Sequence, residues 1–165
     1  ADQWVASERG AARLLADELA LIKSMVTVNT SPLCQAIVGG MILEKGGSLS
    51  AVGRDKGAFY RRNLDKLLSA LDAHISPQLR LEKNIAWNRP KGGFFVRMQL
   101  PVQADETLLN FCATTYGVLW TPMRTFYLND GGQCDIRLSC SYLTDEEIEE
   151  GARRLSQFLS DPRVR

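Results

Sequence analysis

Residues 134–141 read Cys134-Asp-Ile-Arg-Leu-Ser-Cys-Ser141, and Tyr142-Leu-Thr-Asp-Glu-Glu-Ile-Glu-Glu-Gly-Ala-Arg-Arg-Leu155 follows directly. In the first segment polar and apolar residues alternate, which is the period of a strand with one buried face. The second segment contains Thr144-Asp-Glu-Glu147, a capping box whose acidic residues favour the positive end of a helix. The stretch therefore predicts a half-buried strand followed by a closing helix that ends near Leu159.

The region before this stretch is predicted to add further strands and one short helix. Runs rich in β-branched and aromatic residues, bounded by turn residues, are typical of strands. They cover residues 81–87, 92–100 and 118–121. Residues 107–116 have helical spacing instead. A small sheet with a helix inserted between its strands is the expected arrangement.

The first half of the chain is predicted to be mainly helical. Residues 4–23 and 50–71 carry apolar positions at the spacing of amphipathic helices, although Gly10 weakens the first of them. Residues 25–32 are rich in β-branched residues and are predicted to be extended between helices.

Proline marks the start of a further helix. Thr30 or Ser31 precedes Pro32, which is the usual combination of an N-cap with proline at the first helical position. This helix is expected to end near Leu43. The order of all these elements, helices first and then strands mixed with helices, predicts an α+β fold with a small sheet covered by helices.

Composition argues against several classes of protein. Twenty basic residues nearly cancel nineteen acidic ones, and the charges form no basic stripe, so no nucleic-acid partner is expected. The apolar runs are too short to cross a bilayer, and no membrane association is expected. No secretion signal is visible, so a cytoplasmic protein is predicted. Four cysteines without a CxxC pair, beside a single histidine, predict reduced thiols and no metal site.

Two polar features are candidate functional groups. Arg137 alternates with Ile136 and Leu138, so its side chain points to the face opposite theirs. The planar fork of arginine suits two-point binding of a carboxylate, but a surface ion pair would explain a lone strand arginine equally well. Lys91-Gly92-Gly93 precedes a strand and not a helix, so a tight turn that needs positive φ is favoured over a phosphate loop.

The order of four motifs resembles the class I/II aminotransferase family of pyridoxal-phosphate (PLP) enzymes. Pro90-Lys-Gly-Gly-Phe-Phe-Val-Arg-Met-Gln-Leu-Pro101 resembles the family's P-x-G-G-x-F strand. Gly117-Val-Leu-Trp-Thr-Pro122, followed by Phe126, resembles its GV…PG..F segment. Ile136-Arg-Leu-Ser139 with the closing helix resembles its LRLS strand, and Arg61-Arg-Asn-Leu-Asp-Lys-Leu67 its interdomain helix. The resemblance extends over nearly the whole chain.

This resemblance implies a fold-type-I PLP enzyme seen from just after the lysine that holds the cofactor as a Schiff base. Residues 1–44 would end the large PLP-binding domain, residues 45–72 would form the interdomain helix, and residues 73–165 the small C-terminal domain. None of the six lysines lies in the family's S-x-S-K pattern. The resemblance therefore implies that the cofactor lysine lies upstream, in an N-terminal half that this chain needs as a partner, and that no catalytic residue lies in this chain.

The resemblance also implies roles in substrate binding. Arg137 matches the arginine that grips the α-carboxylate of the amino acid substrate, and Gly93, with Gly92, would let the backbone pass close to that substrate. In the aspartate-specific branch an arginine lies near the position of Val26. Valine here implies a free, non-acidic L-amino acid.

A second segment implies a homodimer. Asn29, Thr30 and Ser31 resemble the segment that, in members of this family, reaches across the dimer interface and lines the active site of the neighbouring subunit.

The segment Pro122-Met-Arg-Thr-Phe-Tyr127 departs from the family's usual PG. It is similar to the arginine-handling branch, which includes arginine oxidases and capreomycidine synthase-like cyclases of antibiotic biosynthesis. Arg124 and Tyr127 are therefore candidate substrate contacts, with an arginine that merely anchors its loop as the equal alternative. Three functions stay open: a transaminase, for which an arginine derivative is one substrate, a cyclase or oxidase on the same fold, and a non-catalytic regulatory or oligomerisation module.

Overall fold

The computed structural model describes residues 4–6, 12–27 and 29–164 of the chain. The chain divides into two compact units, Ala1–Val52 and Gly53–Arg165. The boundary between them falls inside helix α3, Leu49–His74.

The first unit contains two short strands and two helices. Strands β1 (Trp4–Ala6) and β2 (Ala12–Leu14) pair antiparallel, and helices α1 (Leu15–Val26) and α2 (Pro32–Glu44) follow. The helix expected over residues 4–23 is therefore wrong in its first half. Gly10, which lies outside the described residues, is a poor helix former, and the flanking segments satisfy their backbone groups by pairing with each other. The extended segment expected over 25–32 is also shorter than predicted, because α1 continues to Val26.

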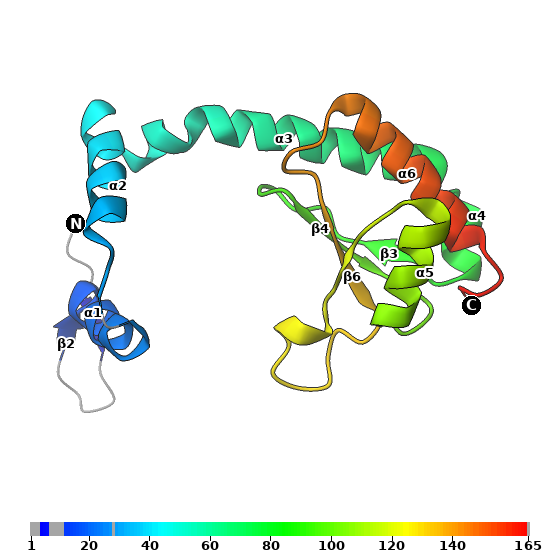
Figure 1. Ribbon diagram of the computed structural model, residues 1–165, viewed down its shortest axis with the longest axis horizontal. Coiled ribbons are helices and arrows are strands. Elements are labelled where there is room, and N and C mark those ends of the chain that lie inside the picture. Colours follow the sequence, from blue (N-terminus) through cyan, green and yellow to red (C-terminus); the bar gives the residue numbers. More distant parts are fainter. Residues whose placement is uncertain (1–3, 7–11, 28, 165) are drawn as a thin grey trace. The chain divides into compact units, whose positions relative to one another are not determined.

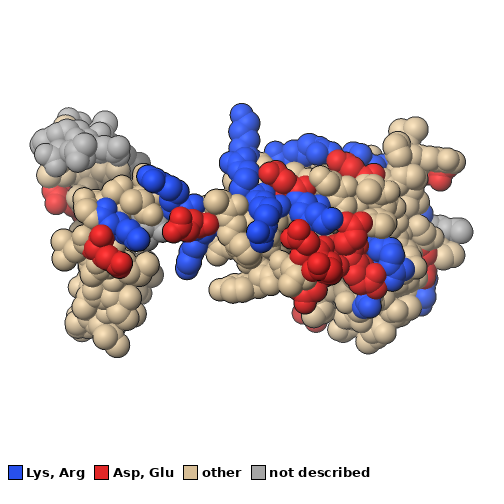
Figure 2. All heavy atoms as spheres, turned by 90° about the horizontal axis from the view of Figure 1, so that it is seen from above, with Lys and Arg blue, Asp and Glu red and all other residues tan. Residues whose placement is uncertain are grey.

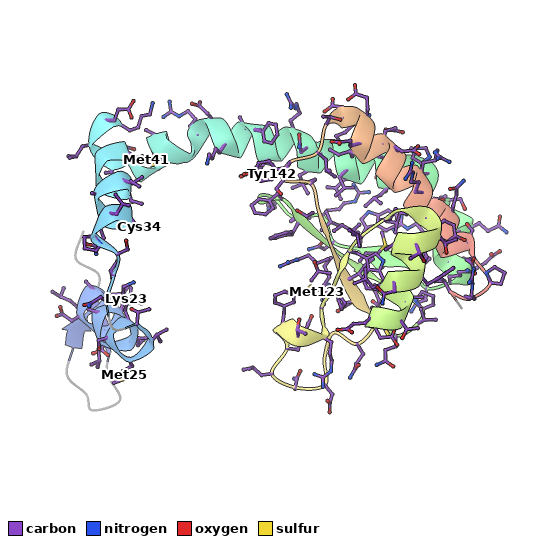
Figure 3. All side chains as sticks on the ribbon, in the orientation of Figure 1. Lys23, Met25, Cys34, Met41, Met123 and Tyr142 are labelled. Atoms are coloured by element: carbon purple, nitrogen blue, oxygen red, sulfur yellow. The ribbon has the colours of Figure 1, made fainter. Side chains whose placement is uncertain are left out.

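The start of α2 is formed as the sequence predicts. The Ser31 hydroxyl accepts a hydrogen bond from the Cys34 amide at 3.4 Å, with Pro32 at the first helical position. None of the described residues of α1 or α2 is buried. Large apolar side chains such as those of Met25 and Met41, which are labelled in Figure 3, are exposed instead. Exposed apolar surface of this kind is typical of interfaces and of ligand grooves.

The second unit is built on a four-stranded antiparallel sheet (Figure 1). The strands lie in the order β3, β4, β6, β5, and their bounds are Ala86–Trp87, Phe95–Gln99, Asp135–Ser139 and Thr121–Pro122 respectively. The remaining elements are α4 (Pro77–Glu82), α5 (Glu106–Tyr116), the 3₁₀ turn η1 (Arg124–Phe126) and α6 (Asp145–Ser160). The predicted α+β fold with a small, helix-covered sheet is confirmed.

Side-chain alternation gives this sheet one covered face and one open face. Val96 and Met98 on β4, with Ile136 on β6, are fully buried and join a core with helices α3, α5 and α6. The residues between them point the other way. This open face carries the side chains of Phe95, Arg97, Gln99, Thr121, Asp135, Arg137 and Ser139.

Local capping signals set the helix boundaries in this unit. The Thr144 hydroxyl accepts from the Glu147 amide at 3.2 Å, and the Glu147 carboxylate accepts from the Thr144 amide at 2.8 Å, so the predicted capping box is confirmed. The strand expected over 81–87 is wrong except at its end. The Ser76 hydroxyl accepts from the Leu79 amide at 3.1 Å and Pro77 follows it, so the chain begins α4 instead.

One buried polar side chain ties helix α3 to the end of strand β6. The Asn63 amide nitrogen donates to the carbonyl oxygens of Cys140, at 2.8 Å, and Leu143, at 3.0 Å. Asn63 is fully buried. Its two hydrogen bonds therefore fix the backbone that leaves the strand carrying Arg137.

The outer surface of α3 and α6 mixes charges of both signs. Figure 2 shows acidic side chains there with basic ones on either side. Lys66 lies 2.9 Å from Glu149, and Arg153 and Arg154 both lie 2.7 Å from Glu150. Among the helices described, none combines the length and apolarity needed to cross a membrane.

Candidate functional site

Arg137 lies on the open face between two phenyl rings. Its guanidinium carbon is 4.1 Å from the ring centroid of Phe95 and 4.7 Å from that of Phe126. Phe95 belongs to β4, and Phe126 belongs to η1, the turn that follows β5, and β4 and β5 are the two neighbours of β6 in the sheet. Both contacts are within the range of a cation–π interaction.

The guanidinium of Arg137 has no polar partner within the described part of the chain. No hydrogen bond or ion pair joins it to another of these residues, and its Nε is buried without an acceptor. An unpaired buried donor costs on the order of 1–3 kcal/mol, so such groups are normally satisfied by a ligand or solvent. The surface ion pair that would make Arg137 purely structural is therefore not present among the described residues.

A second arginine on the open face has its own counter-ion. Arg97 is directly opposite Arg137 in the β4–β6 pairing, where two like charges are unfavourable. The Arg97 Nη1 lies 3.7 Å from the Asp135 carboxylate, and the Tyr127 hydroxyl lies 3.5 Å from each of these groups. Arg97 is thus paired by Asp135, whereas no anion among the described residues pairs Arg137.

The predicted site residue Tyr127 is held in the loop by two glycines. A Cβ at Gly131 would lie 2.5 Å from the Tyr127 ring, and one at Gly132 would lie 2.6 Å from it. Gly132 also has a φ of +70°, which side chains rarely adopt. The loop after β5 therefore wraps closely around this ring and brings its hydroxyl to the open face.

The predicted site residue Arg124 contacts its own loop. Its guanidinium donates to the Asn129 carbonyl at 3.1 Å and to the Asp130 carboxylate at 3.4 Å. These are the contacts of an arginine that anchors the loop. A contact with substrate, and with it the resemblance to the arginine-handling branch, stays a prediction.

The remaining predicted site residues are Gly93, which belongs to the second unit, and residues 29–31, which belong to the first. Gly93 precedes β4 with a φ of +81°, which confirms the turn that needs positive φ. Its approach to a substrate stays a prediction. Asn29, Thr30 and Ser31 belong to the first unit, between α1 and α2, and their contribution to a neighbouring subunit also stays a prediction.

Four residues of the site are not among those predicted from sequence, and one of them, Phe126, lies in η1. Phe95, Arg97 and Asp135 have the same strand parity as Arg137, so the alternation of β4 and β6 places them on its face. That signal is present in the sequence once the two strands are aligned. Their pairing register, which brings Arg97 opposite Arg137, is the part that requires the structure.

The two buried thiols of the described residues, those of Cys112 and Cys140, are poor nucleophiles. Burial raises the pKa of the Cys112 thiol to about 11, and burial also raises the pKa of Cys140. The Lys83 amine donates to three carbonyl oxygens near the end of the chain, those of Leu159, Asp161 and Val164. No cluster of metal-binding side chains occurs among the residues that the structure describes.

Comparison with known proteins gives a consistent result. The family model described as aminotransferase class I and II matches residues 10–155. A (S)-3,5-dihydroxyphenylglycine transaminase of Amycolatopsis orientalis is 41% identical over 97% of this chain. An aromatic-amino-acid aminotransferase of Thermococcus litoralis is 27% identical over 96% of it.

A solved structure has the same fold over most of the chain. It is an α-aminoadipate aminotransferase from Thermus thermophilus, crystallised with N-(5'-phosphopyridoxyl)-L-leucine. The TM-score is 0.68, with 30% sequence identity and 90% of this chain covered. This chain spans about a third of the length of these proteins: 35% of each of the two relatives and 36% of the solved structure.

Proposed function

Because this chain belongs to the class I and II aminotransferase family, we propose that it is the C-terminal part of a PLP-dependent transaminase. The substrate in this proposal is a free, non-acidic L-amino acid. The residues of this chain bind and orient that substrate, and the residues that hold the cofactor, including its lysine, lie in the part of the enzyme that precedes them.

The observation that carries this proposal is the unpaired guanidinium of Arg137. A carboxylate that accepts from both prongs of its fork would satisfy the buried donor and the charge together. The Arg137 guanidinium matches the α-carboxylate of an amino acid in charge and in the geometry of its hydrogen bonds. It also agrees with the family resemblance of the Ile136-Arg-Leu-Ser139 strand.

The mechanism assigned to this chain is orientation. PLP, when bound, supplies the electron sink that stabilises negative charge on Cα as the α-proton leaves. The two-point grip of Arg137 would fix the orientation of the carboxylate, and with it the direction in which the Cα–H bond of the bound substrate points. The two phenyl rings cover part of the guanidinium, and their low polarity relative to water strengthens its attraction for the carboxylate.

The pairing on the open face favours a substrate without a second acidic group. Arg97 is the other cation near Arg137, and Asp135 already lies 3.7 Å from it. A side-chain carboxylate placed there would meet Asp135 as a like charge. The aromatic substrates named for two relatives favour an amino acid with an aryl side chain, including arylglycines, over an arginine derivative.

The proposal is tested by assaying the complete enzyme, with PLP, for amino transfer to a 2-oxo acid. Phenylglycine, phenylalanine, arginine and aspartate are compared as donors at equal concentration. We expect transfer from the aryl donors, with aspartate at least about tenfold slower because its second carboxylate faces Asp135.

The chain alone is the matched control. Treated with PLP and borohydride, it is expected to show no stoichiometric pyridoxyl-lysine by mass spectrometry, since none of its lysines has the family's context. Absence of transfer from every donor by a PLP-loaded enzyme would contradict the proposal. That result would favour a non-catalytic regulatory or oligomerisation module, whereas transfer or cyclisation of arginine alone would favour the arginine-handling branch.

We also propose that the complete enzyme is a homodimer in which residues 29–31 line the active site of the neighbouring subunit. The exposed apolar side chains of α1 and α2 support an interface in this region. The Ser31 hydroxyl caps α2, so Asn29 and Thr30 are the side chains of this segment that we expect to reach a neighbour.

Subunit mixing tests this arrangement. Arg137→Ala and Thr30→Trp are each expected to inactivate a homodimer, by loss of the carboxylate grip and by obstruction. In a mixed dimer one site carries both changes and the other carries neither. Mixing equal amounts should then restore about a quarter of the wild-type activity, as a two-fold symmetric dimer requires. Failure of the mixture to recover activity, with exchange of subunits verified by mass, would place residues 29–31 in their own subunit's site or in none.

A further inference from the structure

We infer that Phe126 and Phe95 are positioning residues that set the plane of the Arg137 guanidinium before substrate binds. This inference rests on the proposed function, in which Arg137 receives the substrate carboxylate. In this inference the two aromatic side chains raise the affinity of Arg137 for the carboxylate, although neither ring contacts the carboxylate.

The two rings differ in how the rest of the protein holds them in place. Phe95 is supported from behind, because its ring centroid lies 4.4 Å from that of Phe94, which lies 4.8 Å from that of Tyr60 on α3. This row of rings connects the guanidinium to the core helix. Phe126 is 54% exposed and lies in η1, so its position depends on the loop that follows β5.

That loop is held by contacts of its own. Arg124 binds the Asn129 carbonyl and the Asp130 carboxylate across the loop, and the Tyr127 ring packs against Gly131 and Gly132. Arg137 therefore contacts the Phe95 ring, which packs on other aromatic rings, and the Phe126 ring, whose position depends on the loop.

The arginine needs this support because no polar group among the described residues orients it. Most buried arginines are held by hydrogen bonds to a carboxylate or carbonyl, but the described residues supply none to Arg137. A free arginine side chain samples many rotamers, and ordering it on binding would weaken the affinity for substrate. Flat contact with an aromatic ring restricts the guanidinium plane and leaves its nitrogens able to donate.

The test compares Phe126→Leu with Phe126→Tyr in the complete enzyme. Leucine keeps an apolar side chain but has no aromatic face, and tyrosine keeps the ring. We expect Phe126→Leu to raise KM for the amino acid about three- to tenfold, with a smaller change in kcat, and Phe126→Tyr to stay near wild type. Leu128→Ala, in the same loop at a fully exposed position, is the matched control and is expected to change neither constant.

A second readout separates positioning from a general disturbance of the loop. A primary amine that lacks the carboxylate, such as benzylamine, should be used as poorly by Phe126→Leu as by the wild type, since Arg137 has nothing to hold in either. An equal loss for benzylamine and the amino acid would show a structural defect and overturn the inference. Phe95→Leu provides a second variant on the opposite ring, with the same expected pattern.

The outcomes also distinguish this inference from the proposed function. If Arg137→Lys raises KM but neither phenylalanine variant does, the carboxylate assignment stands and the rings are not positioning residues. If none of the three variants changes KM, the assignment of Arg137 itself fails.

Discussion

Replacing Arg137 with lysine in the complete enzyme is expected to lower kcat/KM for the amino acid about ten- to a hundredfold. Lysine keeps the positive charge but has a single ammonium group in place of the planar fork. One oxygen of the carboxylate would then be held less well, and a hydrogen bond to a charged group contributes roughly 1.5–3 kcal/mol. Steady-state kinetics with the preferred donor measure the effect.

The cofactor provides the control for this variant. PLP content, measured after alkaline release, is expected to equal that of the wild type, because Arg137 is assigned to the substrate and not to the cofactor. Loss of PLP with unchanged affinity for substrate would show that the assignment is wrong. An unchanged enzyme would mean that the arginine has no role in substrate binding.

The change Asn63→Asp is expected to lower the free energy of unfolding of the chain by about 3–5 kcal/mol at pH 7. The Asn63 amide donates to the carbonyls of Cys140 and Leu143 in a fully buried site. A carboxylate there would lose both hydrogen bonds and would face two carbonyl oxygens without a counter-ion. Denaturant unfolding followed by circular dichroism measures the difference.

The pH dependence of this variant follows from the same contacts. Burial without a cation raises the pKa of the introduced carboxyl in the folded state, so the folded protein favours its protonated form. The destabilisation is therefore smaller at pH 4 than at pH 7, and it grows as pH rises past the pKa of the unfolded chain. Asn110→Asp, at an exposed position of α5, is the matched control and is expected to stay within about 0.5 kcal/mol of wild type. A loss below about 1 kcal/mol at Asn63 would mean that its two hydrogen bonds do not stabilise the fold.

Helix starts in this chain could be predicted where an N-cap and a proline stand together, or where a capping box is complete. Ser31 before Pro32 predicts α2, and Thr144 with Glu147 predicts α6, because each signal depends only on neighbouring residues. The combination at Ser76 and Pro77 starts α4 in the same way. The strand expected over 81–87 overlooks it and relies on apolar composition, which cannot distinguish a short strand from a short helix.

The part of the site that depends on local sequence could also be predicted. Strand alternation and the family resemblance both single out Arg137, since each is a property of the local sequence. The ring of Phe126 and the pairing of Arg97 with Asp135 depend on which strands are neighbours and in what register. Residues that are distant in sequence set that register, so composition and spacing do not reveal it.

The role of Arg137 as the group that receives the substrate carboxylate is tested most directly by a crystal structure of the complete enzyme with a bound 2-methyl amino acid. Such a ligand has a carboxylate but no Cα hydrogen to lose. We predict both carboxylate oxygens within hydrogen-bonding distance of the Arg137 guanidinium, with the rings of Phe95 and Phe126 still in contact with it. A carboxylate held by other residues, with Arg137 paired to an acidic side chain of the protein, would contradict this role.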